Sequence, residues 1–405
     1  MKKILIIGAG DFQLPLVQKA AEKYEVCLAA PSIDERFEKH IKSKCLCDVR
    51  DYDTILEYAN SEGVDGVITD QTDIPVRTVA YVAEKLNLSG IGLECAKLFT
   101  DKSLMRSKLE ECSIPVLPYL TTDDIEEAKA FFNNLNSAVI VKPLDTQGSR
   151  GVIKAENEAE LEAAFDISKS FSTNGKAVVE KYASGPELVI EGITVDGEMM
   201  AQICGDTIYF NNKSTFSAKK RIFPSLLSKG IVDKTLKLNK KIVKAFGLNN
   251  GITHGEYIID GDEVYLIEIA ARGGGVYISS DLISDQLGID VESFLLSIAM
   301  GEKPRLDIKT PDRVSGYRAF YLPKGTVKEI VGRDEVKSFD FIRHNQLDNI
   351  KPGMELGENT NKTSRFAMII SAPDYDKWRE YEKKVIDTLH VLVEYDGKIR
   401  DIIWE

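Results

Sequence analysis

The sequence predicts an α/β protein that begins with a doubly wound parallel sheet. In the first 95 residues, short apolar runs that end in turn residues alternate with segments of helical periodicity. This alternation is typical of parallel strands joined by crossover helices. The strands are expected in KILIIGAG, YEVCLAA and GVDGVITDQ, and the helices in LPLVQKAAEKY and IPVRTVAYVAEKLNL. With 405 residues, the chain is long enough for two or three domains with cores of their own.

The first expected strand ends in a glycine turn that resembles part of a dinucleotide-binding fingerprint. Gly8 and Gly10 match its first two glycines, but Gln13 takes the place of the third, and no acidic residue clearly closes a second strand. The alternative to a nicotinamide site is that the glycines only let the strand turn into the helix.

Composition and charge exclude several classes of partner. A net charge of -12 argues against nucleic acid, because a phosphate backbone requires a basic face. No apolar stretch approaches the length of a membrane span, and the apolar run of MKKILIIGAG stops at Asp11 without a cleavage site. The six cysteines are scattered and lack the spacing of a metal motif. We therefore expect a cytoplasmic protein with reduced thiols.

Two further regions follow the N-terminal one. In the second, a helix should begin at Asp101 and end before Pro115. It should be followed by the strand–loop–strand segment AVIVKPLDTQGSRGVIKA, by strands around a turn at residues 184–186, and by a hairpin with an Asp260–Gly261 turn. From about Pro304, GYRAFYLPKGTVKEIVG, RFAMIISAPD and a charged helix predict a smaller α+β region.

The loop in VKPLDTQGSRGV has the composition of an anion-binding loop. Lys142 leaves a strand, and Gly148, Ser149 and Gly151 can bring backbone N–H groups close to a phosphate. It is not a Walker A loop, because the lysine precedes the glycines. The alternative is an ordinary hairpin with a surface lysine.

The predicted hairpin carries one carboxylate on each strand. Glu256 and Glu268 can lie on one face, where two ionised carboxylates repel unless a cation lies between them. Such oxygen ligands suit Mg2+, and Arg272 offers a guanidinium fork to phosphate oxygens. The alternative is a structural ion pair between glutamate and arginine.

The segment VVEKYASGPELVIEG connects two expected strands through a turn near Gly185. Glu180 begins a stretch whose backbone groups can bond a flat base, and Glu187 can accept from ribose hydroxyls. Turns of this kind are common, so this segment is informative only together with the others.

In this order, DKSLMRSKLEECSIPVLPY, VKPLDTQGSRGV, VVEKYASGPE and HGEYIIDGDEVYLIEIAARGGG resemble the successive motifs of the ATP-grasp superfamily. The resemblance extends from about Met1 to Gly301. It implies an ATP-grasp fold with an N-terminal pre-ATP-grasp domain over 1–95, an ATP-grasp domain over 96–305 with a lid subdomain at about 116–183, and a C-terminal α+β region over 306–405.

The resemblance also implies roles for particular residues. Lys102 and Lys142 would contact ATP phosphates, and the loop 145–151 would cover them. The adenine would lie at the hinge formed by Glu180, Lys181, Tyr182 and Ala183, and the ribose at Glu187. Glu256 and Glu268 would hold the metal, and Arg272 would face the transferred phosphoryl group. Many members have an asparagine where this chain has Ala270, so a second metal ion would need Glu268 to bridge two ions, with water completing the shell, or another residue in place of the asparagine.

Residues for the substrate are less well defined by the sequence. Lys219, Lys220 and Arg221 form a basic run that would bind a substrate carboxylate or lie as a solvated strand edge. His254 would hydrogen-bond the substrate or be a structural histidine. Further candidates are the glycines 273–275, with Gly274 at their centre, then Arg318, and also Asp70 and Asp73, which end a strand on the crevice side of the sheet.

The family consists of ligases that form an acyl phosphate from ATP and a carboxylate, so the resemblance implies an ATP-dependent carboxylate–amine ligase with an amino acid as one substrate. Its expected cofactors are ATP and Mg2+, with Mn2+ as an alternative ion. Its expected partners are small molecules, with a homodimer as an assembly to test. Two alternatives are a purine-pathway enzyme such as glycinamide ribonucleotide synthetase and an ATP-binding module without catalysis.

Overall fold

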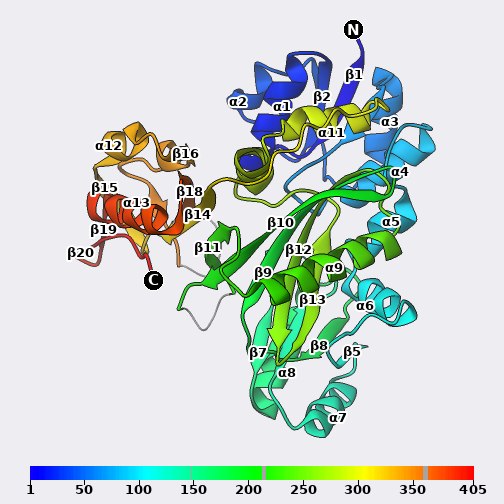
Figure 1. Ribbon diagram of the computed structural model, residues 1–405, viewed down its shortest axis with the longest axis vertical. Helices are drawn as coiled ribbons and strands as arrows, with labels where there is room; N and C mark the ends of the chain where they lie inside the picture. Colours follow the sequence, from blue (N-terminus) through cyan, green and yellow to red (C-terminus); the bar gives the residue numbers. More distant parts are fainter. Residues whose placement is uncertain (147, 212–215, 359–363) are drawn as a thin grey trace.

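A computed structural model describes residues 1–146, 148–211, 216–358 and 364–405. Figure 1 shows the N-terminal sheet at one end, the lid elements α7 and α8 at the other, and the C-terminal elements to one side. Among the helices of the described ranges, none is long and apolar enough to cross a bilayer.

The N-terminal region is the parallel, doubly wound sheet that the sequence predicts. Its strand order is β3-β2-β1-β4, and all three pairings are parallel. The strand β3 was not expected, because its short SKCL segment carries little hydrophobic signal. The strands are β1 Lys3–Ile7, β2 Glu25–Ala30, β3 Ser43–Leu46 and β4 Gly66–Ile68; the helices are η1 Asp11–Gln13, α1 Leu14–Ala21, α2 Glu35–Glu38, α3 Tyr52–Glu62 and α4 Val76–Lys85.

The glycine turn after β1 is closed by a side chain. Gln13 Oε1 accepts from the N–H of Gly10 at 2.8 Å, and Gln13 Nε2 donates to the carbonyl of Asp70 at 2.8 Å. Gln13, which stands where the dinucleotide fingerprint has its third glycine, therefore joins the ends of β1 and β4.

A small antiparallel sheet in the order β5-β8-β6-β7 lies within the predicted lid range. Its helices α7 and α8 share a core with it through residues such as Phe165 and Val141. The strands are β5 Tyr119–Thr122, β6 Val139–Pro143, β7 Ile153–Ala155 and β8 Ala177–Lys181; the helices of this part are α5 Leu93–Leu98, α6 Lys102–Glu111, α7 Ile125–Leu135 and α8 Glu158–Phe171.

The central sheet has eight strands in the order β13-β12-β9-β10-β11-β14-β18-β16, all antiparallel. It continues across the predicted boundary at 305/306, because β11 pairs with β14. Its strands are β9 Glu187–Val195, β10 Glu198–Tyr209, β11 Ala218–Phe223, β12 Gly251–Asp260, β13 Glu263–Ala270, β14 Val314–Tyr321, β16 Ile342–Asn345 and β18 Arg365–Ala372; its helices are α9 Lys229–Ala245, the π-helical η2 Ile278–Ile283, α10 Ser284–Leu287 and α11 Val291–Ala299.

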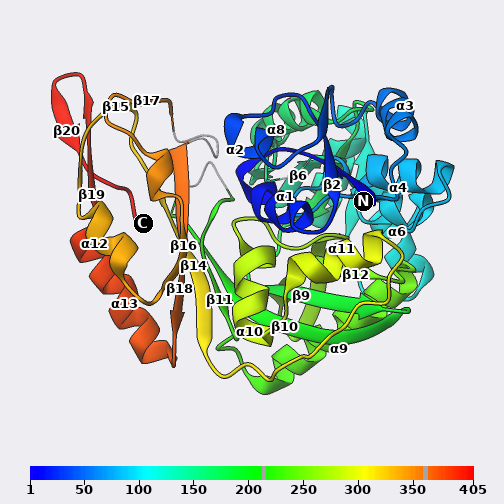
Figure 2. The same cartoon turned by 90° about the horizontal axis from the view of Figure 1, so that it is seen from above.

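The remaining C-terminal elements form a sheet in the order β17-β15-β19-β20 with two helices. Figure 2 shows them on the side of β14 and β18 that lies away from the N-terminal sheet. They are β15 Gly325–Val331, α12 Arg333–Ser338, η3 Leu347–Asn349, β17 Glu355–Leu356, α13 Tyr375–Thr388, β19 His390–Tyr395 and β20 Lys398–Arg400.

One hydrophobic core joins the N-terminal and central sheets. Ile4 and Ile6 of β1 belong to the same buried cluster as Val189 of β9 and Phe294 of α11. Burial of this apolar surface fixes the carboxyl ends of β1 and β4 next to the segment that follows β13.

Candidate active site

The two predicted carboxylates face each other across the hairpin. Glu256 on β12 and Glu268 on β13 are direct cross-strand partners, and a β-bulge follows Glu256. The pairing expected from the short turn is therefore confirmed.

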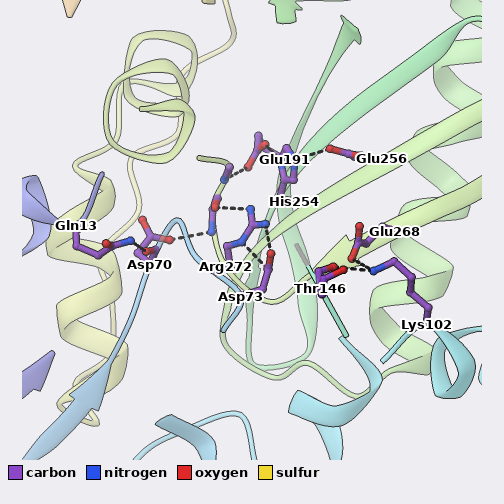
Figure 3. Close-up of polar contacts among 12 residues, drawn as sticks. Gln13, Asp70, Asp73, Lys102, Thr146, Glu191, His254, Glu256, Glu268 and Arg272 are labelled. Carbon is purple, nitrogen blue, oxygen red and sulfur yellow. Dashed lines mark hydrogen bonds and ion pairs between the residues drawn. The ribbon is translucent and has the colours of Figure 1, made fainter. Parts of the chain in front are cut away.

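Each carboxylate of this pair has a cation as its partner. Lys102 Nζ donates to Glu268 Oε1 at 2.8 Å and to the carbonyl of Thr146 at 3.1 Å, as Figure 3 shows. Arg221 donates to Glu256 Oε1. Burial alone would raise the pKa of Glu256, but Arg221 and His254 hold this pKa well below its usual range. Glu256 is therefore ionised at neutral pH.

The donor set fits a hard divalent cation held by two carboxylates. Mg2+ commonly takes one or two protein carboxylates and completes its shell with water and phosphate oxygens. Ala270 supplies no ligand, and the described parts of the chain contain no group of three or more His, Cys, Asp or Glu side chains that could hold a metal. Glu256 and Glu268 are thus the residues that would hold such an ion.

Arg272 is oriented by the N-terminal domain. Its Nε and Nη2 donate to the two carboxylate oxygens of Asp73 at 2.7 and 2.8 Å, and its Nη1 donates to the carbonyl of Gly273 at 2.9 Å. Asp70 Oδ1 accepts from the N–H of Gly273 at 2.9 Å, and burial raises the pKa of Asp70. The two aspartates proposed for substrate therefore contact the chain segment after β13 instead (Figure 3).

His254 lies between two carboxylates and an arginine. Its Nδ1 is hydrogen-bonded to Glu191 Oε1, while its Nε2 lies 2.6 Å from Arg221 Nη1 and 3.4 Å from Glu256 Oε1. Glu191 was not among the residues expected at the site. Its only local signal is a carboxylate in the middle of the apolar strand ELVIEGITV, the same kind of signal that Glu268 gave.

The candidate phosphate lysine Lys142 belongs to a buried ion cluster. Glu180 accepts from Lys142 Nζ at 2.5 Å and from Arg106 Nε at 2.7 Å. Burial alone would raise the pKa of Glu180, but the two cations lower it to about 2. The Glu180 carboxylate thus pairs with two cations. Arg106, which was not expected from the sequence, also donates to the carbonyl of Ile267 at 2.7 Å.

The backbone N–H groups of the predicted hinge differ in whether they have an acceptor. The N–H groups of Lys181 and Tyr182 donate to the carbonyls of Pro118 and Ala138. For the next N–H, that of Ala183, no acceptor is found among the described residues. Gly185 packs so closely on β12 that an added Cβ would lie 1.6 Å from the carbonyl oxygen of Ile259, which accounts for the glycine at this turn.

The glycine-rich loop turns through left-handed backbone. Gly148, Ser149 and Gly151 have φ angles of 70°, 58° and 72°, a region that glycine adopts without steric cost. Residue 147 of the predicted loop lies outside the described residues. Lys102 contacts this loop through the carbonyl of Thr146.

Glu187, expected at the ribose, accepts a hydrogen bond from the hydroxyl of Tyr209. Burial raises the pKa of Glu187 to about 7, and the nearby charge of Glu256 adds to this effect. The carboxyl group is therefore partly protonated at neutral pH, so that it can donate as well as accept a hydrogen bond.

The basic run 219–221 is divided between two places. Arg221 contacts Glu256, whereas Lys220 Nζ lies 2.5 Å from Glu382 Oε1 on α13, because successive residues of a strand point to opposite faces. Arg318, the cross-strand partner of Lys220, is fully buried and pairs with Glu382 at 2.7 Å. The structure thus does not bring Lys220 and Arg318 to the carboxylate pair.

Comparison with known proteins identifies the fold family. A family model of the ATP-grasp domain matches residues 135–281, a range that contains the glycine-rich loop, the hinge and the acidic hairpin. The resemblance to the ATP-grasp superfamily that the sequence shows is therefore confirmed over this range.

Curated relatives of the chain include two ligases. The chain is 25% identical to a phosphoribosylamine–glycine ligase of Thermococcus kodakarensis over 296 residues, which are 67% of each protein. It is 24% identical to an L-arginine-specific L-amino acid ligase of Bacillus subtilis over 288 residues, which are 66% of each protein. The matches thus span about two thirds of either relative.

The fold extends over nearly the whole chain. The crystal structure of an L-amino acid ligase from Bacillus licheniformis superposes with a TM-score of 0.83 at 21% identity, covering 98% of this chain and 99% of that one. The predicted ATP-grasp fold is therefore confirmed. The expected class of enzyme is supported by the curated relatives, which are named ligases. The roles of individual residues stay predictions.

Proposed function

We propose that this protein activates a small-molecule carboxylate as an acyl phosphate at the expense of ATP and joins it to an amine, with an amino acid as one substrate. The observation that carries the proposal is the cross-strand pair Glu256 and Glu268, with Arg221, Lys102 and His254 in direct contact with it. Phosphoryl transfer depends on alignment and on neutralisation of charge, which this set of groups supplies.

ATP would extend from the hinge to this pair. The backbone of Lys181 to Ala183 would receive the adenine and Glu187 the ribose. Lys102 and Lys142 would receive the phosphates under the loop 145–151. Mg2+ held by Glu256 and Glu268, or Mn2+ in its place, would neutralise phosphate charge when bound.

The reaction has two balanced steps. In the first, a carboxylate oxygen of the substrate bonds to the γ-phosphorus of ATP and ADP leaves. In the second, the amine nitrogen bonds to the acyl carbon, phosphate leaves, and the nitrogen loses a proton. Arg272 would stabilise the transferred phosphoryl group, and His254 would accept the proton. A loop that covers the site would protect the acyl phosphate from water.

A purine-pathway ligase, which joins phosphoribosylamine and glycine, is a second candidate. It is favoured by the similarity to the Thermococcus enzyme, which is 25% in identity against 24% for the amino acid ligase. ATP binding without catalysis is the third reading, for which Ala270 is the main support.

A phosphate-release screen tests all three readings. The protein is incubated with Mg-ATP and paired carboxylates and amines, including pairs of amino acids and the pair phosphoribosylamine and glycine. Phosphate and ADP released only with one pair of amino acids supports the first proposal, and release only with phosphoribosylamine and glycine supports the second. Tight ATP binding without release from any pair contradicts both. Glu268→Gln serves as the inactive control.

We also propose a cytoplasmic location and small-molecule partners, as expected for an enzyme of metabolism. A homodimer stays a prediction, which light scattering of the purified protein would test.

A further inference from the structure

Glu191 on β9 is a buried carboxylate to which none of the roles above has been assigned. It is 1% exposed, and both of its oxygens are engaged. Oε1 is bonded to His254 Nδ1, and Oε2 accepts from the N–H of Gly274 at 3.1 Å. A buried carboxylate is unfavourable unless it is paired or hydrogen-bonded, so these two contacts explain how the position is tolerated.

The two ring nitrogens of His254 have different partners. The Nη1 of Arg221 can only donate and lies 2.6 Å from Nε2, so Nε2 of the neutral ring accepts and Nδ1 carries the hydrogen. Nδ1 then donates to Glu191 Oε1. Arg272 is a further charged group close to Glu191.

The contact with Gly274 ties the ring to the segment that carries Arg272. An added Cβ at Gly274 would lie 2.7 Å from Glu191 Oε1 and 2.9 Å from His254 Nδ1. The glycine therefore lets the backbone approach the carboxylate closely enough to donate. Through its bonds to His254 and Gly274, Glu191 joins β12 to the chain two residues beyond Arg272 (Figure 3).

We propose that Glu191 is a positioning residue that fixes the tautomer of His254 and the backbone after Arg272, so that Nε2 of the ring faces Arg221 and Glu256. Its catalytic consequence rests on the proposed function, whereas the positioning itself is a property of the protein without substrate.

The tautomer of His254 is measured by NMR of the full chain labelled with 15N-histidine. The sequence contains four histidines, and a His254→Gln variant assigns the signal. We expect the Nδ1–H tautomer in the wild type and a changed tautomer distribution in Glu191→Gln, because glutamine offers one acceptor oxygen where Glu191 accepts from both His254 and Gly274.

Glu382→Gln is the matched control, since it also removes a buried carboxylate, but one that contacts Lys220 and Arg318. It should leave the His254 signal unchanged. An unchanged tautomer in Glu191→Gln would overturn the inference. If that variant does not fold, Glu191→Asp is used: its side chain is too short to reach both partners, so a wild-type tautomer would equally overturn the inference.

Once a substrate pair is known, kcat of Glu191→Gln should fall by about 100-fold, as for a misplaced catalytic group, with the KM for ATP unchanged. Absence of turnover in the wild type would contradict the proposed function but leave the NMR result valid. Turnover in the wild type with wild-type NMR and kinetics in the variant would contradict the role of Glu191 alone.

Discussion

Replacing Glu180 with glutamine removes the charge that joins two cations in the protein interior. The carboxylate is 2% exposed and accepts from Arg106 Nε at 2.7 Å and from Lys142 Nζ at 2.5 Å. Its pKa is lowered from 4.5 to about 2, because the two cations outweigh the effect of burial. Since one pKa unit corresponds to about 1.4 kcal/mol, the ionised carboxylate contributes about 3 kcal/mol to stability at neutral pH.

We therefore expect Glu180→Gln to lower the free energy of unfolding by about 3 kcal/mol at pH 7. A group with a lowered pKa stabilises the fold fully above its unfolded value of 4.5, and this contribution decreases as the pH falls toward about 2. The difference between wild type and variant should accordingly be about 1 kcal/mol smaller at pH 3.5 than at pH 7. Urea denaturation at the two pH values, followed by circular dichroism, measures both numbers.

The control is Glu162→Gln on α8, where the half-exposed carboxylate pairs with Lys129 at 2.6 Å. We expect no measurable change from it, because exposed ion pairs contribute little. A difference below about 1 kcal/mol for Glu180→Gln at pH 7, or one that does not decrease at pH 3.5, would refute the reasoning.

Three further substitutions test the site. Glu268→Gln should abolish turnover with an unchanged thermal midpoint, and retained phosphate release would contradict the role of this carboxylate. Lys142→Ala should weaken ATP binding by about 10- to 100-fold in calorimetry, the value of a charge-assisted hydrogen bond; an unchanged affinity would exclude the phosphate contact. Gly274→Ala should lower the free energy of unfolding by about 1–3 kcal/mol through its clash with Glu191. Gly230→Ala, which meets no atom within 4 Å, should not be destabilising.

Local signals in the sequence predict the elements that carry the site. Asp101 was expected to begin a helix, and its side chain accepts from the N–H groups of Ser103 and Leu104 at the start of α6. The hairpin that pairs Glu256 with Glu268 follows from its short turn. In both cases the residues that determine the structure are close in sequence, so the local sequence pattern is enough to predict how they are arranged.

The contacts between distant residues were not predictable in the same way. Asp73 and Arg272 are 199 positions apart, and Arg106 and Glu180 are 74 apart. No periodicity relates such pairs, because they meet only after the sheets pack against each other.

The orientation of Lys219 in the basic run was not predictable for a different reason, which is an irregularity of the strand. The pairing of β10 with β11 shifts its register, so that Ile208 faces Lys220 and Tyr209 faces Ala218, and Lys219 has no partner in that ladder. Lys219 then contacts Glu405 rather than following Arg221 toward Glu256. Three consecutive basic letters do not reveal a bulge of this kind.

The buried cluster around Glu180 also explains how a lysine can serve a phosphate from the protein interior. If Lys142 were its only partner, a lysine that turned to a phosphate would leave a buried carboxylate uncompensated, which is strongly unfavourable. Arg106 removes this obstacle, because its Nε stays on Glu180 and its Nη2 is held by the carbonyl of Ile267 at 2.7 Å. Arg106 therefore leaves Lys142 available for the proposed phosphate contact. The stability that Glu180 contributes and this phosphate contact thus depend on the same ion cluster.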